Sequence, residues 1–189
     1  MFALVTGGTG FIGLNLVDRL LKDGWQVRIL SRKPGKLKKI DWIVGDILDK
    51  QITEKAVSGV DIIFNLAGAL PYHHTTDKIY WDTNVTGVEN ILKACLGKAV
   101  KRIVHVSTVG IYGSTGNDVF SEKSKMHLDS IYAKTKAKGE DLVMDYFKKY
   151  KLPVVVIRPT IGYGYFDTRP GFLNLFRLLK KGWFILLGN

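Results

Sequence analysis

Short apolar runs alternate with longer amphipathic runs along the chain. The short runs have the β-branched, continuously apolar character of strands buried in a sheet: Phe2–Thr6, Gln26–Leu30, Asp41–Val44, Asp61–Asn65, Lys101–Val106 and Val154–Ile157. The longer runs have the period of about 3.6 residues typical of helices: Phe11–Lys22, Asp77–Leu96, Asp129–Tyr150 and Pro170–Lys181. This alternation predicts an α/β domain with a doubly wound parallel sheet and helices on both of its faces.

Glycine and polar residues collect in the loops that follow the predicted strands. These loops are Thr6–Gly13, Ser31–Lys33, Asn65–Gly68, Ser107–Thr108 and Arg158–Thr160. Parallel strands bring their carboxyl ends to one edge of the sheet, and ligands of doubly wound domains bind outside that edge. We therefore expect a single ligand site there.

Gly7, Gly10 and Gly13 recur every third residue between the first strand and the first helix. Such a turn needs glycine where the chain reverses, where the backbone meets a pyrophosphate, and where the helix packs on the strand. The free amides and the dipole of the helix N-terminus then attract the phosphates. The pattern predicts a Rossmann-type dinucleotide site, with Thr9, Phe11 and Ile12 completing the turn. The alternative is a tight turn without a ligand.

Residues at the end of the second strand indicate which dinucleotide binds. Domains that bind NAD place an acid there, on the ribose 2′-hydroxyl, whereas this chain has Ser31, Arg32 and Lys33. An arginine can hold a 2′-phosphate with two hydrogen bonds. We therefore predict NADP as the cofactor, with NAD as the alternative if the two cations are ordinary surface residues. Asp46, after the third strand, is placed to accept from the adenine amino group or to cap a turn.

A catalytic constellation is predicted from Thr108, Tyr132 and Lys136. Tyr132 and Lys136 are spaced i, i+4 and share a helix face. A neighbouring ammonium stabilises a phenolate and lowers the pKa of a tyrosine. Lys136 could also donate to the nicotinamide ribose. The Thr108 hydroxyl could hold a substrate carbonyl or alcohol while Tyr132 moves the proton.

The order of motifs resembles that of the extended short-chain dehydrogenases/reductases, which include nucleotide-sugar epimerases and dehydratases, dihydroflavonol reductases and 3β-hydroxysteroid dehydrogenases. The motifs that carry the resemblance are Thr6-Gly7-Gly8-Thr9-Gly10-Phe11-Ile12-Gly13, Asp46-Ile47, Asn65-Leu66-Ala67-Gly68, Asn84-Val85-Thr86-Gly87, Val106-Ser107-Thr108 with Tyr112-Gly113, Tyr132-Ala133-Lys134-Thr135-Lys136 and Arg158-Pro159-Thr160. The resemblance implies catalysis by Thr108, Tyr132 and Lys136. It also implies further cofactor-site residues, namely Ile47, Leu66, Ala67, Gly68, Asn84, Ser107 and Pro159. Asn84 could equally be a helix cap or a buried structural amide.

The chain departs from this family in two ways. Sugar epimerases usually carry an aspartate after the second strand, and Ser31-Arg32 in its place favours NADP-dependent reductases. Family members also continue beyond the equivalent of Asn189. We therefore expect residues 1–189 to form the dinucleotide-binding domain, with about 160–189 beginning a substrate-binding part that is mostly absent from this chain.

Three functions follow as hypotheses. The first is an NADP(H)-dependent oxidoreductase that transfers hydride to or from a carbonyl or alcohol of a small molecule. The second is a nucleotide-sugar epimerase or dehydratase that retains NAD(P). The third is a non-catalytic dinucleotide-binding module or redox sensor, and it has no need of Thr108, Tyr132 and Lys136. The chain as given is expected to have little activity.

Composition narrows the class of protein. The formal net charge is +11, but the lysines are spread over several segments and no nucleic-acid-binding motif occurs, so we do not expect nucleic acid as a partner. No apolar stretch reaches the roughly 18 residues of a membrane span, and no signal peptide precedes the first strand, which predicts a cytoplasmic protein. Cys95 is expected to be buried. His73 and His74 lack further ligands, so no metal is expected. The apolar run Trp183-Phe184-Ile185-Leu186-Leu187 predicts self-association, and a homo-oligomer is possible.

Overall fold

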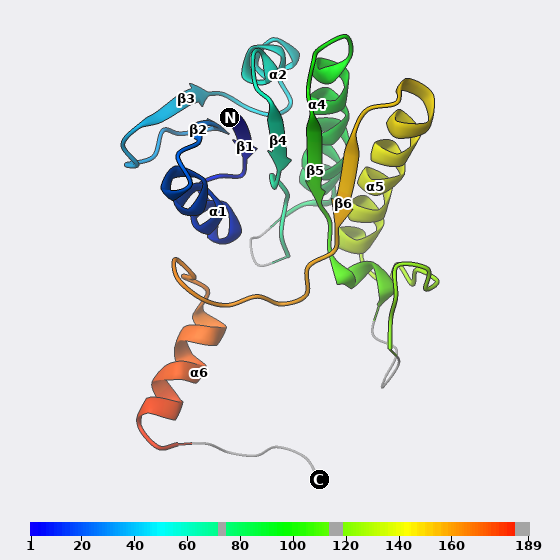
Figure 1. The fold of residues 1–189 in the computed structure, drawn as a ribbon. Helices are drawn as coiled ribbons and strands as arrows, with labels where there is room; N and C mark the ends of the chain where they lie inside the picture. Colours follow the sequence, from blue (N-terminus) through cyan, green and yellow to red (C-terminus); the bar gives the residue numbers. More distant parts are fainter. Residues whose placement is uncertain (72–74, 114–118, 184–189) are drawn as a thin grey trace.

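The computed structural model describes residues 1–71, 75–113 and 119–183, and its centre is a six-stranded parallel sheet (Figure 1). Its strands lie in the order β3-β2-β1-β4-β5-β6. Their bounds are β1 Phe2–Thr6, β2 Gln26–Ser31, β3 Ile40–Val44, β4 Ile62–Asn65, β5 Arg102–Val106 and β6 Val154–Ile157. The order reverses between β1 and β4, and such a reversal opens a crevice at the carboxyl edge of a doubly wound sheet. The predicted Rossmann-type fold is confirmed.

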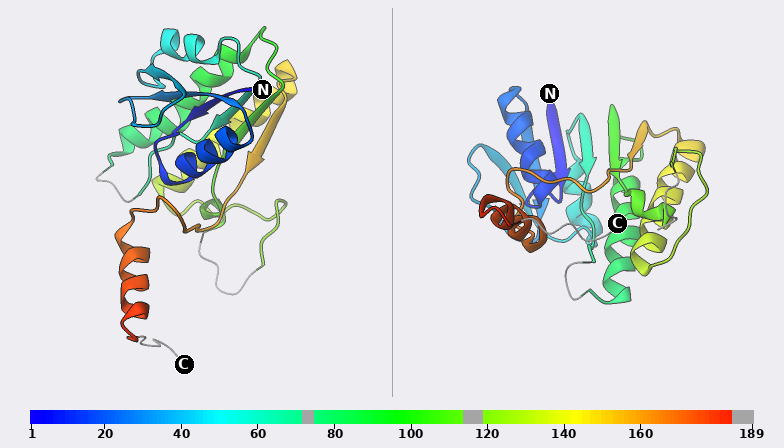
Figure 2. Two further views of the ribbon diagram at one scale, coloured as in Figure 1. Left: turned by 60° about the vertical axis from the view of Figure 1, so that its left-hand side comes forward. Right: turned by 90° about the horizontal axis from the view of Figure 1, so that it is seen from below.

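Helices cover both faces of the sheet (Figure 2). α1 (Phe11–Lys22) packs on one face through Val17 and Leu20, against β1 and β2. The other face carries α2 (Lys50–Val57), α4 (Gly87–Cys95) and α5 (Ile131–Tyr150). Each of these helices buries one apolar side, which is why the amphipathic periodicity located most of them.

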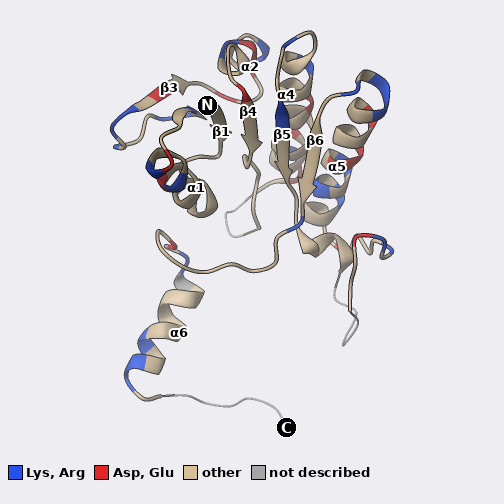
Figure 3. Ribbon diagram, in the orientation of Figure 1, with Lys and Arg blue, Asp and Glu red and all other residues tan. Residues whose placement is uncertain are grey.

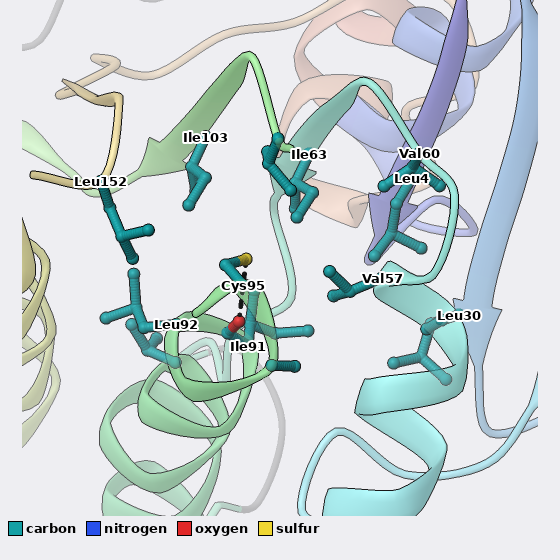
Figure 4. Packing of buried hydrophobic residues seen from close by; sticks show 14 of the residues in the cluster. Leu4, Leu30, Val57, Val60, Ile63, Ile91, Leu92, Cys95, Ile103 and Leu152 are labelled. Atoms are coloured by element: carbon teal, nitrogen blue, oxygen red, sulfur yellow. Dashed lines mark hydrogen bonds between the residues drawn. The ribbon is translucent and has the colours of Figure 1, made fainter. Parts of the chain in front are cut away.

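The larger hydrophobic core lies between the sheet and the second helical layer (Figure 4). Ile91, Leu92 and Cys95 of α4 point toward Ile63 and Ile103 of the sheet, and all five are at most 1% exposed. The Cys95 thiol donates to the Ile91 carbonyl oxygen at 3.0 Å, and burial raises its pKa to about 12. The expectation that Cys95 is a buried structural residue is confirmed.

The structure corrects the predicted helix over 77–96. Three segments occupy it: α3 (Asp77–Trp81), a π-helical turn η1 (Asp82–Thr86) and α4. A π turn inserts one residue into a helix and is common beside functional sites. Two further elements escaped the sequence prediction, namely α2, capped by Asp49 through the amides of Gln51 and Ile52, and the 3-10 turn η2 (Val109–Tyr112).

The chain after β6 leaves the sheet at its carboxyl edge and ends in α6 (Pro170–Lys180), which lies away from the helical layers (Figures 1 and 2). On the way, residues 160–169 pass the start of α1. The Asn15 amide donates to the Tyr165 carbonyl at 2.7 Å, and the Arg169 guanidinium stacks 5.0 Å from the centre of the Phe11 ring.

Several large apolar side chains of α6 are substantially exposed, among them Phe176 at 45% and Leu178 at 48%. Trp183 is 69% exposed. The rest of the apolar run, Phe184–Leu187, lies outside the described residues. Self-association through this run therefore stays a prediction.

Basic residues are distributed over separate elements (Figure 3). They occur on α1, on the connection between β2 and β3, at the end of α5 and on α6. Within the described ranges, each helix is too short or too polar to cross a lipid bilayer.

Candidate functional site

The turn after β1 has the geometry that its glycines require. Gly7 has a φ of +68°, and a Cβ there would lie 2.8 Å from the backbone of Leu66 and Ala67. A Cβ on Gly13 would lie 2.2 Å from the Gly7 carbonyl oxygen, so this glycine lets α1 pack onto the turn. Gly10 has space beside it, with its nearest contact at 3.4 Å. Backbone is thus open at the middle glycine, where a phosphate can approach.

The start of α1 has no side-chain cap. Gly10 is its N-cap residue, and among the described residues of its first turn none is acidic. The first backbone bond within the helix runs from Leu14 N to Gly10 O. By contrast, the start of α2 is capped by Asp49 and that of α5 by Ser130. The α1 amides therefore present an uncompensated positive helix end, which suits an anion.

A pocket of about 380 Å³ extends from this turn across the switch point of the sheet. Its walls come from the predicted motifs and from neighbouring loop and helix residues: Thr6, Gly7, Thr9, Leu30, Ser31, Arg32, Gly45, Asp46, Ile47, Ala67, Gly68, Ala69, Leu70, Thr75, Ile79 and Thr83. A wall that combines Gly-rich backbone, Arg32 and both apolar and polar side chains fits a dinucleotide.

The arginine and lysine after β2 lie on the surface beside the pocket. Arg32 lines it, while Lys33 is exposed and is not part of its wall. Asp46 also contributes to the wall, and its Oδ1 accepts from Leu48 N at 3.0 Å in a local turn. The turn function that the sequence left open for Asp46 is therefore present, and a role toward adenine stays a prediction.

A polar network fixes the strand ends on either side of the switch point. The Thr6 hydroxyl donates to Asn65 Oδ1 at 2.7 Å and accepts from Ala67 N at 3.1 Å. Asn65 Nδ2 lies 3.2 Å from His105 Nδ1. All of these groups except Ala67 are at most 2% exposed. Burial lowers the pKa of His105 to about 3, so the imidazole is neutral at pH 7 and can accept from Asn65.

Asn84 lies in the π turn and is 1% exposed. Its Oδ1 accepts from Ala69 N at 2.9 Å, and its Nδ2 donates to the Thr135 hydroxyl at 3.1 Å. The side chain thereby ties the loop after β4 to α5. These contacts are those of a buried structural amide, and a direct part in cofactor binding stays a prediction.

Thr108 and Tyr132 lie on either side of Gly110. A Cβ added to Gly110 would be 3.3 Å from the Thr108 hydroxyl oxygen and 4.0 Å from the Tyr132 ring. The Thr108 hydroxyl also accepts from Gly110 N at 3.0 Å, capping η2. The Tyr132 ring packs at a tilt against Tyr80, with centroids 6.2 Å apart. Both hydroxyl-bearing residues thus come close to Gly110.

Lys136 is buried one turn after Tyr132, at 5% exposure. Its Nζ donates to the Val106 carbonyl oxygen at 2.6 Å, and a Cβ on Gly68 would lie 3.9 Å from that nitrogen. Gly68 lines the pocket, so the ammonium lies close behind this part of the pocket wall. Burial lowers the pKa of Lys136 to about 8, although Glu140 opposes this shift.

A partly buried ion pair, which sequence reasoning missed, joins α5 to the residue after β6. The Arg158 guanidinium holds both carboxylate oxygens of Glu140, with distances of 2.6 to 3.1 Å. It also donates to the Tyr112 hydroxyl at 2.6 Å. The partners are 18 and 46 positions apart in the sequence, so no local spacing indicated them. The motif Arg158-Pro159-Thr160 was the available signal.

The remaining predicted residues have varied surroundings. Phe11 is half-buried beneath Arg169, Ile12 is 46% exposed, and Leu66 and Pro159 are half-buried. Ser107 is 4% exposed. The pocket wall adds residues that the motifs did not include, notably Leu30, Gly45, Ile79 and Thr83. Gly45 and Leu30 directly flank predicted motifs, whereas Ile79 and Thr83 belong to α3 and η1, whose positions depend on the fold.

Over the ranges that the structure describes, no group of three or more metal-ligating side chains comes together. His73 and His74 lie outside those ranges.

Comparison with known proteins identifies the family. The model of the NAD-dependent epimerase/dehydratase family matches residues 3–178. The chain belongs to this family.

Relatives within the epimerase/dehydratase family carry out several reactions. A putative dihydroflavonol 4-reductase from Synechocystis is 32% identical over 176 residues, which cover 88% of this chain and 50% of that protein. The N-acetyl-α-D-glucosaminyl-diphospho-ditrans,octacis-undecaprenol 4-epimerase of Escherichia coli O157:H7 is 26% identical over 98% of this chain and 56% of that protein. The family is enzymatic, and its named members include a putative reductase and an epimerase.

Solved structures in the epimerase/dehydratase family share the fold and bind NAD. The UDP-glucuronic acid 4-epimerase from Bacillus cereus, in complex with NAD, superposes with a TM-score of 0.83 at 27% identity over 97% of this chain and 64% of that one. The dTDP-glucose 4,6-dehydratase DesIV from Streptomyces venezuelae, also with NAD bound, gives a TM-score of 0.84 at 28% identity over 96% and 63%. The chain spans about half the length of the curated relatives it matches.

Proposed function

We propose that this chain binds NADP(H) and belongs to an oxidoreductase that transfers hydride to or from a carbonyl or alcohol, with Tyr132 as the acid/base. The observation that carries the proposal is Arg32. It lines the dinucleotide pocket at the end of β2, where Ser31 and Lys33 flank it and no acid is present. A carboxylate at this point would repel a 2′-phosphate, and a guanidinium can bind it with two hydrogen bonds.

Each part of the chain has an assigned task in this proposal. Open backbone at Gly10 and the amides at the start of α1 hold the pyrophosphate, while Gly7 and Gly13 let the turn close. The nicotinamide supplies or accepts the hydride. Lys136, close to Gly68 of the pocket wall, holds the nicotinamide ribose and stabilises the Tyr132 phenolate.

The substrate would be held next to Tyr132. The Thr108 hydroxyl positions the substrate oxygen, and the Tyr132 hydroxyl gives or takes its proton. The nearness of both residues to Gly110, with the Thr108 hydroxyl oxygen 3.3 Å and the Tyr132 ring 4.0 Å from a Cβ added there, supports this division of labour. General acid–base catalysis of this kind typically contributes about 10²- to 10⁴-fold in rate.

Titration calorimetry with NADPH and NADH tests the cofactor assignment. We expect NADPH to bind more tightly, and Arg32→Ala to weaken NADPH by about 10- to 100-fold with little change for NADH, as for hydrogen bonds to a charged group. Arg32→Asp should invert the preference. Arg102→Ala is the matched control, because Arg102 is exposed at the opposite edge of the sheet. Equal affinities in the unchanged chain would refute the assignment.

An epimerase or dehydratase that retains NAD is the second candidate. It is favoured by the epimerase from Bacillus cereus and DesIV, both solved with NAD. Such an enzyme needs its dinucleotide throughout the cycle, so the cofactor should remain bound after extensive dialysis and should favour NAD. A reductase should exchange its cofactor and oxidise NADPH when a carbonyl substrate is added. A dinucleotide-binding module without activity would bind cofactor and do neither.

A further inference from the structure

Lys136 and Glu140 are neighbours on the buried side of α5. They are spaced i, i+4, one turn apart, and are 5% and 4% exposed. Opposite charges at this spacing usually attract each other across the turn. Here the carboxylate and the ammonium have other partners. The Lys136 ammonium donates to the Val106 carbonyl, and Arg158 occupies both oxygens of Glu140.

Arg158 is itself held from several directions. Besides Glu140, its Nη1 donates to the Tyr112 hydroxyl at 2.6 Å and to the Glu122 carbonyl at 3.2 Å. Its guanidinium lies 5.5 Å from the centre of the Tyr112 ring, and that ring stacks on Phe120 at 5.0 Å. The end of β6, the turn η2 and the segment around residue 120 thus fix the guanidinium on the side of Glu140.

Without Arg158, Lys136 and Glu140 would be the charged pair left at this place. Lys136 faces Glu140 from its own helix and His105 from β5, and His105 is neutral at pH 7. Tyr132 lies one turn before Lys136, and Arg158 faces Glu140 from just after β6 while also donating to the Tyr112 hydroxyl of η2. Glu140 is therefore the acid that acts on the ammonium. Uncompensated, it would draw Lys136 away from Val106 and from the pocket.

We propose that Arg158 is a positioning residue, which neutralises and holds Glu140 so that Lys136 stays on the Val106 carbonyl, close to Gly68 of the pocket wall. The inference rests on the proposed function for its importance in catalysis, because only then does Lys136 serve the nicotinamide ribose and Tyr132. The effect of Arg158 on the Lys136 ammonium, which it does not contact, can be measured without cofactor or substrate.

The test follows the titration of the Lys136 ammonium by ¹⁵N NMR in the cofactor-free chain, with the resonance assigned by its loss in Lys136→Met. In Arg158→Gln, the uncompensated Glu140 should raise the pKa of Lys136 by about one unit or more. Arg158→Lys, which keeps the charge, should shift it less. Arg102→Gln removes an exposed cation of β5 and should leave the titration unchanged. A melting temperature that falls in Arg158→Gln while Lys136 titrates as before would show a purely structural ion pair and overturn the proposal.

A second set of variants covers the case in which Arg158→Gln does not fold. Removing one partner of a buried pair leaves a buried charge and is strongly destabilising, whereas replacing both is often tolerated. Glu140→Gln alone should lower the pKa of Lys136, since the acid that opposes the effect of burial is gone. The double variant Glu140→Gln, Arg158→Gln should fold, and the pKa of Lys136 should not rise in it. An unchanged Lys136 titration in Glu140→Gln would overturn the proposal, whatever the cofactor preference of the chain.

Discussion

Alanine at Gly13 and at Gly10 should separate folding from cofactor binding. A Cβ at position 13 would lie 2.2 Å from the Gly7 oxygen and 2.6 Å from the Gly8 Cα, whereas real Cβ contacts are essentially never below 3.0 Å. The distance from this Cβ to the Gly7 oxygen is thus about 0.8 Å too short. Because both atoms belong to or are fixed by the backbone, no side chain can rotate away to relieve the contact. Relief requires α1 to move off the turn.

The cost of Gly13→Ala can be put at the upper end of the range for overpacking, about 3 kcal/mol. With a urea m-value of about 2 kcal/mol/M, the midpoint of unfolding should fall by roughly 1.5 M. Affinity for NADPH should fall as well, because the displaced helix carries the amides that meet the phosphates. Urea denaturation followed by circular dichroism measures the first effect, and fluorescence titration with NADPH measures the second.

Gly10→Ala is the matched control, since its Cβ would meet only the Gly7 oxygen at 3.4 Å, an ordinary contact. Gly10 has a φ of −83°, which alanine adopts freely. Alanine is a poorer N-cap residue than glycine, which destabilises the fold, but it also lowers the conformational entropy of the unfolded chain, which stabilises the fold. These effects roughly cancel, so the free energy of unfolding should change by less than about 1 kcal/mol. The methyl group would nevertheless stand where the phosphate approaches, and affinity should fall about 10-fold or more. A Gly13→Ala chain as stable as the unchanged protein, or a Gly10→Ala chain with full affinity, would refute this account of the turn.

Three further predictions concern the buried site and the chain as a whole. Tyr132→Phe should abolish turnover while cofactor affinity stays within about 2-fold, and Lys136→Ala should lose both turnover and cofactor affinity. Steady-state kinetics on a form of the protein that turns over substrate, together with cofactor titration, measures the two effects. Full activity in Tyr132→Phe would show that the assignment is wrong. Burial lowers the pKa of Lys136 from 10.5 to about 8. Between pH 8 and pH 10.5, Lys136 is therefore protonated in the unfolded chain and largely neutral in the folded one. The free energy of unfolding should rise by about 3 kcal/mol over this range. Lys136→Met should lack this rise in urea titrations at several pH values, and an equal rise in both proteins would contradict the linkage. The 189 residues span about half the length of their relatives, and substrate orientation can account for about 7–11 kcal/mol of a barrier. This chain alone should therefore bind dinucleotide yet show little turnover. Robust turnover by a chain that sedimentation shows to be a monomer would disprove this.

The strands and the phosphate turn could be predicted because their signals are local. β1, α1 and β6 have the predicted bounds, since a buried strand needs an apolar run and a half-buried helix needs an apolar stripe. α2 was missed because it has only eight residues and a polar composition, and its clearest mark is the capping residue Asp49. Short helices depend more on packing than on their own sequence.

The non-local part of the site could not be predicted from spacing. In the sequence, nothing distinguishes Glu140 from the other charged residues of its lysine-rich helix. Its role becomes visible only in the fold, where Arg158, the residue after β6, pairs with it. Similarly, Thr6, Asn65 and His105 come from three strands, and only the parallel register brings them into one network. Motif order indicated which loops meet, whereas pairings within the buried layer depend on the packing of α5 against the sheet.

The π turn η1 has a consequence for comparing this chain with other sequences. One residue more than an α-helical turn would hold is accommodated between Asp82 and Thr86, without ending the helix that runs from α3 into α4. Deleting one residue there would return the turn to α-helical geometry, and α3 and α4 would keep their present faces, with Tyr80 still against Tyr132. Deleting one residue elsewhere in the helix would turn one part relative to the other by about 100°. Relatives with an uninterrupted α-helix should therefore align with a single-residue gap inside 82–86, and a gap placed elsewhere in the helix would match residues from different faces.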